Sequence, residues 1–499
     1  MEQTKEGAFK LYNIRYLPLF AAFFILGIFC VKLSYATAAI IGGVAILCSL
    51  ALLFTKSIKR PVAIALIVVV LFGYGIATLE LHLRNDVGLS GEVQVTCRIT
   101  DVTELADGSY SVVADRVRQG AKSYDGGLTF RTEENLSVGD RLTINGEIEI
   151  REVSLQNVFS AIEYRKGAKY EITPETLIAE EGSPPLSYAI KEEVRAVLVQ
   201  YEGERAGGFS YAMIFGDTEY MERADKSAMR AVGVAHVFAV SGLHIGVLAA
   251  ALIFLLKKMR VKAKALPFVV FPFFAFYAYL VGFTPSVLRA SVMVLVGLAA
   301  STLGERYDDL SAISLAAILI LLVRPLYLFD VSFIMSFLAI FGIACLAKPL
   351  EKAFLKRKMK APLASGLALS VAVSIALVPV SAVVFGEVSL IGFVLNILVV
   401  PLASVAYILT LISLLLTTLS PAFGALLSTV AYLPLFIIEL SLRAAELGLV
   451  ASYDFSAAEI LLYYAILFFV GKYSLAKRKV KFVVGGTGLG ALAILLFVL

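Results

Sequence analysis

Long apolar runs constrain this chain more than any other feature of its sequence. A helix needs about 20 apolar residues to cross the ~30 Å hydrocarbon core of a bilayer. Thirteen runs approach or exceed that length, namely 17–33, 36–54, 61–81, 236–256, 266–283, 287–303, 310–323, 327–347, 361–385, 389–418, 427–448, 456–472 and 482–499. Hydrophobic residues make up 59% of the chain and charged residues 17%, which excludes a soluble globular protein. We therefore expect a polytopic α-helical membrane protein with about 11–13 spans.

Basic residues at the ends of these runs predict the orientation of the chain. Loops rich in Lys and Arg face the cytoplasm. Such clusters follow the second, fourth, eighth and twelfth runs, at residues 56–60, 257–264, 348–360 and 472–481. Every cluster follows an even-numbered run. The pattern predicts a cytoplasmic N-terminus, an external C-terminus and an external location for residues 88–185.

Residues 88–185 form the one substantial polar segment. Apolar and polar residues alternate there in five short runs, with turn signals such as Asp107-Gly108 and Asn145-Gly146 between them. The apolar positions lie within 93–99, 112–113, 128–130, 142–150 and 159–164. Five strands fit a small all-β barrel of the OB type. Between residues 90 and 172, ten Lys and Arg face fourteen Asp and Glu, so a domain that caps the membrane part and a DNA-binding domain both stay open.

Residues 186–235 connect this domain to the next apolar runs. The spacing of Ile190, Val194 and Val197 predicts an amphipathic helix over 187–201, either at the membrane surface or as a linker. Residues 211–217 then form an apolar half-span that ends at Gly216-Asp217, which is typical of a re-entrant segment. The predicted organisation is three N-terminal spans (1–87), the β domain (88–185), the amphipathic and re-entrant segment (186–235), a central transmembrane domain (236–420) and the C-terminal spans (421–499).

The run at 236–256 begins with His236, Ser241 and His244, two of the three histidines of the chain among them. Ionisable residues at membrane depth usually mark a functional site. Ser241 and His244 are three residues apart and share a face of a helix, and a serine with a histidine is the minimum for nucleophilic catalysis. His236 and His244 would lie about 80° apart around the same helix. Hydrogen bonding in a packed bundle, lining of a pore, and catalysis or metal binding are the three interpretations.

Arg289 is the best candidate for a fixed positive charge in the membrane. It follows Pro285 by about one turn, at the predicted external end of the run 287–303. An anionic substrate in a low-dielectric slab needs such a charge along its path. The alternative is an ion pair, with Asp217, Asp330 or Glu387 as the partner on the same side.

Asn396 and Pro401 lie in an apolar stretch, 389–418, that is too long for one straight span. A helix broken near a substrate path would explain the length. The alternative is a proline kink in which Asn396 bonds a carbonyl that the proline has freed.

Several of these motifs in one order resemble the ComEC family of competence proteins. The matching segments are Tyr211, Gly216-Asp217, 233–236, 239–244, 285–290, 324–333, 336–337 and 396–401. They cover roughly residues 205–405. The resemblance implies an inner-membrane channel for uptake of single-stranded DNA in bacterial natural transformation, with an external OB-like domain. The candidates for the DNA path are then Asp217, His236, Ser241, His244, Arg289 and Asn396.

The chain departs from that family in one respect. Full-length members usually carry a C-terminal metallo-β-lactamase-like domain, but His82, His236 and His244 cannot supply its HxHxDH metal motif. No P-loop is present in the sequence. We therefore expect no enzymatic activity and no cofactor, and a separate nuclease and a separate cytoplasmic DNA-translocating motor as partners.

Two other functions compete with a DNA channel. One is a secondary transporter or a lipid or polysaccharide exporter with a similar bundle, which predicts inverted repeats between the halves of the chain. The other is an intramembrane hydrolase that uses Ser241. The sequence does not indicate the oligomeric state.

Overall fold

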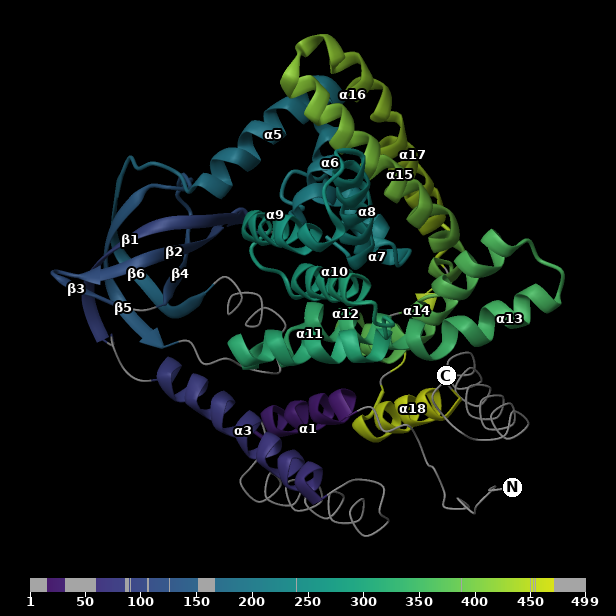
Figure 1. Ribbon diagram of the computed structural model, residues 1–499. Helices are drawn as coiled ribbons and strands as arrows, with labels where there is room; N and C mark the ends of the chain where they lie inside the picture. Colours follow the sequence, from purple (N-terminus) through teal and green to yellow (C-terminus); the bar gives the residue numbers. More distant parts are fainter. Residues whose placement is uncertain are drawn as a thin grey trace, which may run out of the picture.

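The fold is a bundle of apolar helices with a β domain at one side (Figure 1). The computed structural model describes residues 16–31, 60–85, 89, 91–105, 107–124, 126–150, 167–238, 240–386, 388–448, 450–451, 453 and 455–470. Within these residues, eight helical segments are long and apolar enough to cross a membrane. The prediction of a polytopic helical membrane protein is therefore confirmed. Two predicted spans, 36–54 and 482–499, lie outside the described residues.

Helices account for the other predicted runs. The apolar helices are α1 (Tyr16–Cys30), α3 (Arg60–Asn85), α8 (Gly242–Lys258), α9 (Leu266–Leu280), α10 (Pro285–Leu303), α11 (Asp309–Val323), α12 (Val331–Gly342), α14 (Ala361–Phe385), α15 (Gly392–Leu419), α16 (Gly424–Val430), α17 (Tyr432–Ala445) and α18 (Ala457–Val470). Short 3₁₀ turns cover Ala235–Val237, Ala263–Ala265, Pro325–Phe329 and Pro421–Phe423. A π-helical turn, Ile343–Ala347, continues α12 into the basic helix α13 (Lys348–Lys356).

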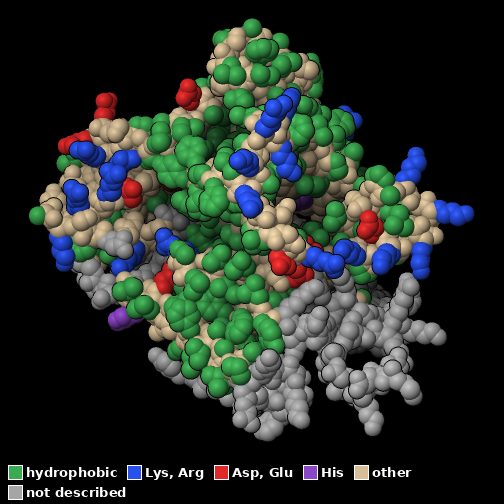
Figure 2. All heavy atoms as spheres, in the orientation of Figure 1, with side chains coloured by type: hydrophobic (Ala, Val, Ile, Leu, Met, Phe, Trp, Pro, Cys, Tyr) green, Lys and Arg blue, Asp and Glu red, His purple; other side chains and the backbone are tan. Residues whose placement is uncertain are grey.

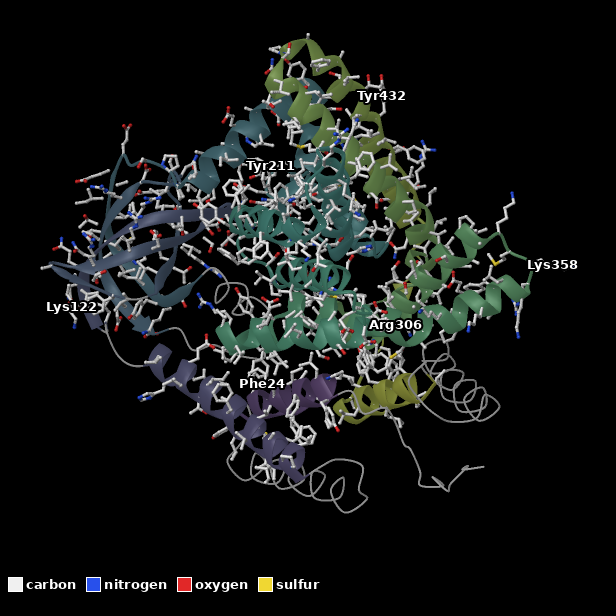
Figure 3. All side chains as sticks on the ribbon, in the orientation of Figure 1. Phe24, Lys122, Tyr211, Arg306, Lys358 and Tyr432 are labelled. Carbon is white, nitrogen blue, oxygen red and sulfur yellow. The ribbon has the colours of Figure 1, made fainter. Side chains whose placement is uncertain are left out.

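Large apolar side chains cover much of the outside of the bundle, as the space-filling view shows (Figure 2). Phe254, Phe268 and Leu461 are all more than two-thirds exposed. Exposed apolar area on this scale suits a lipid environment rather than water. The basic residues of α13 and of the turn that follows it project from the bundle, and Lys358 lies at the tip of that projection (Figure 3).

The β domain is a ring of strands. Its strands are β1 (Gly91–Glu104), β2 (Tyr110–Gln119), β3 (Lys122–Ser123), β4 (Gly127–Thr132), β5 (Arg141–Ile150) and β6 (Ala168–Glu180). The sheet order β1-β5-β6-β4-β2-β3 is closed by a further pairing of β1 with β2, so five long strands surround one core and β3 extends the β2 end. Alternate residues such as Val95, Cys97 and Ile99 fill that core, as period-two patterning predicts.

The fifth strand lies later in the sequence than predicted. Residues 159–164 fall outside the described residues, and the strand that completes the ring is β6. Pro174 in its interior argues against a strand on sequence grounds, because proline cannot donate a ladder hydrogen bond. The structure accommodates Pro174 opposite Gly146, where the register between β5 and β6 shifts. A side chain at Gly146 would collide with the carbonyl of Thr173, so glycine is required there.

Three helices connect the β domain to the bundle: α5 (Leu186–Glu202), α6 (Glu204–Phe215) and α7 (Arg223–Ala231). Helix α5 confirms the helix predicted over 187–201. Helix α6 ends at Gly216, whose left-handed backbone (φ 74°) forms the C-cap and stops the apolar half-span. Arg205 donates two hydrogen bonds, of 2.8 and 2.6 Å, to the buried carboxylate of Asp225. This pair fixes α6 against α7.

Proline and tyrosine residues shape the C-terminal helices. Pro379 in α14 cannot donate to the carbonyl of Ile375, and the hydroxyl of Tyr463 on α18 donates to that oxygen instead. The hydroxyl of Tyr464 donates to the carbonyl of Ala376 at 2.9 Å. In this way α18 supplies a donor to the Ile375 carbonyl, which Pro379 deprives of its helical partner, and Tyr464 adds a second contact between the two helices.

The prediction of a broken helix at Pro401 is wrong. Helix α15 continues from Gly392 to Leu419 with Pro401 inside it. Pro401 removes one backbone hydrogen bond and crowds the carbonyl four residues earlier, and packing against neighbouring helices allows the helix to continue. The alternative that Asn396 bonds a freed carbonyl is also not found, because Asn396 Oδ1 is buried without a hydrogen-bond partner and no bond from its amide is seen among the described residues.

Candidate anion site at the start of α10

Ser241 and His244 form a reciprocal cap at the start of α8. The Ser241 side chain accepts a hydrogen bond from the His244 backbone N–H at 3.4 Å, and His244 Nδ1 accepts one from the Ser241 N–H at 3.3 Å. This is a capping box with histidine in the place usually taken by Glu or Gln. Because Nδ1 is an acceptor, the neutral ring carries its proton on Nε2.

His236 does not belong to the same helix. It lies in the 3₁₀ turn Ala235–Val237, and the regular helix begins only at Gly242. The prediction that His236 and His244 lie 80° apart on one helix is therefore wrong, because it treated the whole run as helical. The side chain of His236 is exposed, whereas that of His244 is 3% exposed.

His244 belongs to a buried polar cluster that joins four helices. Its ring packs on that of Tyr407 from α15, with centroids 4.6 Å apart. The hydroxyl oxygens of Tyr407 and Tyr277 are 3.2 Å apart, and Tyr277 donates to the carbonyl of Ile214 at 2.6 Å. The cluster thus connects α8, α15, α9 and α6 inside the largest hydrophobic core of the bundle. It supports a structural role for His244.

Arg289 is a buried cation in the second turn of α10. Its side chain is 3% exposed, and its Nε and Nη1 atoms have no hydrogen-bond partner among the described residues. Neither Asp217 nor Asp330 pairs with it: Asp217 lies 4.0 Å from Lys191 Nζ, and Asp330 accepts the backbone N–H groups of Ser332 and Phe333. Glu387 lies outside the described residues.

The start of α10 also lacks a cap. Its N-cap residue, Thr284, makes no capping hydrogen bond, and the Thr284 hydroxyl is buried without a partner within the described part of the chain. Pro285 occupies the first turn and lacks an N–H, while the other N–H groups of that turn give the helix end a partial positive charge. An uncapped N-terminus therefore lies one turn before a guanidinium whose Nε and Nη1 have no partner in the part of the chain that the structure describes.

Two neighbouring helices border this site. The hydroxyls of Ser286 and Ser332 are 3.3 Å apart and join the first turns of α10 and α12. Gly242, the first residue of α8, lies against the guanidinium of Arg289. The guanidinium of Arg289, which α10 carries, thus lies against the first residue of α8. Positive charge of this kind, buried and with no counterion among the described residues, suits anionic groups such as phosphate.

The structure brings together only part of the predicted set. Ser241 and His244 lie at the end of α8 that Arg289 approaches, whereas Asp217 pairs with Lys191 and Asn396 lies on α15. In the parts of the chain that the structure describes, no three His, Cys, Asp or Glu side chains gather to hold a metal ion. Sequence analysis missed Tyr277 and Tyr407, and it included Gly242 only as part of the segment 239–244, without a link to Arg289. For Gly242, its place directly after a helix-capping serine was the available signal.

The geometry of Ser241 and His244 suits a helix cap better than a nucleophile and its base. Ser241 Oγ is 3.5 Å from His244 Nδ1, which is beyond the range of a good O–H···N bond. The same nitrogen already accepts the Ser241 backbone N–H. A serine nucleophile needs its proton directed to a free base nitrogen.

Comparison with known proteins places the chain among competence proteins. The profile of the family described as "Competence protein" matches residues 213–477, slightly more than half of the chain. The chain is 30% identical over 220 residues to "ComE operon protein 3" of Bacillus subtilis, covering 44% of this chain and 28% of that protein. It is 30% identical over 153 residues to "Recombination protein 2" of Haemophilus influenzae, covering 29% of this chain and 19% of that protein. The matches therefore span less than a third of either relative. No solved structure is significantly similar.

Proposed function

The chain belongs to the competence protein family, and on that premise we propose that it forms the path by which single-stranded DNA crosses the bacterial inner membrane during natural transformation. The segments that resembled the ComEC family, from Tyr211 to Pro401, lie almost entirely inside the match to the family profile. The proposal gives the protein a transport role with no catalytic step of its own.

The observation that carries the proposal is that Arg289 is buried and that its Nε and Nη1 have no hydrogen-bond partner among the described residues. Burying a cation without a partner costs several kcal/mol, and a side chain that served packing alone would be apolar. An anionic ligand that pairs with the guanidinium would offset this cost. A phosphodiester passing the start of α10 would offer its oxygens to Nε and Nη1 of Arg289 and to the uncapped end of the helix.

We further propose that the β domain is OB-like and lies outside the cell. The closed ring of five long strands supports the first point. The alternation of basic loops supports the second, since the loop at 348–360 then faces the cytoplasm. The acidic balance of the domain favours a role in holding the membrane part over tight binding of DNA.

A separate nuclease and a cytoplasmic motor complete the proposed system. The described residues offer no cluster of metal ligands, and the capping geometry of Ser241 disfavours hydrolysis. Purified protein is accordingly expected to leave labelled DNA intact in Mg²⁺, Mn²⁺ or Zn²⁺. Cleavage that copurifies with the protein through several columns and is lost in the Ser241→Ala variant would contradict this part of the proposal.

Deletion of the gene in its competent host tests the proposal as a whole. Cells receive labelled double-stranded DNA, and we measure DNase-protected label in the cytoplasm and the number of transformants. Loss of cytoplasmic label and of transformants, with DNA binding to the cell surface retained, is the expected result. Unchanged transformation in the deletion strain would overturn the proposal.

A further inference from the structure

We propose that Gly242 is a positioning residue for Arg289: the absence of a side chain at the first residue of α8 creates the space that the guanidinium occupies. This inference rests on the proposed function, in which Arg289 contacts the phosphate backbone of DNA. It adds a second helix to that site, because the position of a cation on α10 then depends on a residue of α8.

The geometry leaves no room for a larger residue. A Cβ atom added to Gly242 would overlap Nη2 of Arg289 and lie 3.4 Å from its Cζ. The next atom is the Cβ of Ala290, at an ordinary contact distance of 3.8 Å. The clash is therefore with the end of one long side chain and not with backbone. Arg289 can relieve it only by moving its charged group.

Gly246 provides a matched control one turn later on the same helix. A Cβ added there would meet no described atom within 4 Å. Alanine is also a better helix former than glycine, so Gly246→Ala should be neutral or slightly stabilising. The backbone of Gly242 lies within a helix as well and has no left-handed φ. Its requirement for glycine is thus a matter of space.

A double-mutant cycle on the purified full-length protein tests the contact itself. Gly242→Ala is expected to lower Tm in the wild-type background, because a buried guanidinium is displaced. In the Arg289→Ala background the same substitution should leave Tm unchanged or raise it, because the space is vacant and helix propensity improves. Equal decreases of Tm in the two backgrounds would overturn the inference, since Gly242 would then be needed for something other than Arg289.

Uptake of labelled DNA in cells tests the consequence. Gly242→Ala should reduce uptake strongly at normal protein level, while Gly246→Ala should not. Arg289→Lys lacks the planar Nη2 group, so the double variant Gly242→Ala/Arg289→Lys should take up as much DNA as Arg289→Lys alone. Normal uptake in Gly242→Ala would overturn the positioning role.

The two proposals fail in different ways. If Arg289→Ala leaves uptake unchanged, the DNA path at Arg289 is wrong, although the Tm cycle can still show the contact. If Arg289→Ala abolishes uptake but Gly242→Ala does not, the path stands and the role of Gly242 is wrong.

Discussion

At the scale of single residues, the proposed DNA path depends on Arg289, a buried guanidinium near the start of α10. The sequence indicates that Arg289 follows Pro285 at the start of an apolar run, and the structure places it in the second turn of α10. Its choice of partner could not be predicted, because three acids were plausible by topology and only packing decides among them. In the described residues, Asp217 and Asp330 have other partners, which leaves the guanidinium available.

Substitution of Arg289 separates the two interpretations of this residue. Arg289→Ala should abolish DNA uptake at normal protein level, because the charge serves the substrate and its removal leaves no paired acid behind. Arg289→Lys should retain part of the uptake, because it keeps the charge but loses the fork of donors. Protein level by immunoblot and uptake of labelled DNA are measured together.

The ion-pair alternative predicts a different outcome. If an acid depended on Arg289, Arg289→Ala would leave a buried charge unpaired at a cost of roughly 3–5 kcal/mol, and the protein would disappear from the membrane. Normal level with normal uptake would contradict both interpretations.

At the scale of elements, hydropathy located the helices but not their ends. Apolar length predicts α8, α14 and α15 because bilayer thickness fixes it. It could not show that α8 begins at Gly242, since residues 235–240 are as apolar as the helix that follows. In the β domain the alternation of side chains located β1, β2, β4 and β5, whereas Pro174 concealed β6. The start of α8 and the position of β6 were both mispredicted because tertiary contacts outweigh the local sequence preference there.

The cap of α8 gives a prediction at this scale. Asparagine is as good an N-cap as serine but is no nucleophile, so Ser241→Asn should preserve both Tm and DNA uptake. Ser241→Ala should lower the stability by about 1 kcal/mol through loss of the cap. Thermal unfolding and uptake are measured for both variants. Loss of uptake in a stable Ser241→Asn protein would indicate that the hydroxyl itself has a chemical role.

At the scale of the whole molecule, the charge pattern predicts which end of the bundle faces the cytoplasm. Lys122 in the β domain and Lys358 at the tip of the α13 projection lie at opposite ends of the structure in this view (Figure 3). In intact cells, a membrane-impermeant maleimide should label Lys122→Cys but not Lys358→Cys, and permeabilised cells should show label at both. Cys30, Cys97 and Cys345 are buried, Cys48 lies outside the described residues, and the unsubstituted protein gives the background label from all four. Label at position 358 in intact cells would contradict the predicted orientation and indicate the opposite one.

Photo-crosslinking during DNA uptake tests the central claim most directly. A small diazirine side chain replaces Ser286, one turn before Arg289, and, as a control, Phe268 on the lipid-exposed face of α9, which is 80% exposed. Cells take up labelled DNA and are irradiated. We predict that labelled single strands crosslink to the protein at position 286 and not at 268. DNA uptake that proceeds with no crosslink at 286, or with equal crosslinking at both positions, would contradict a DNA path past Arg289.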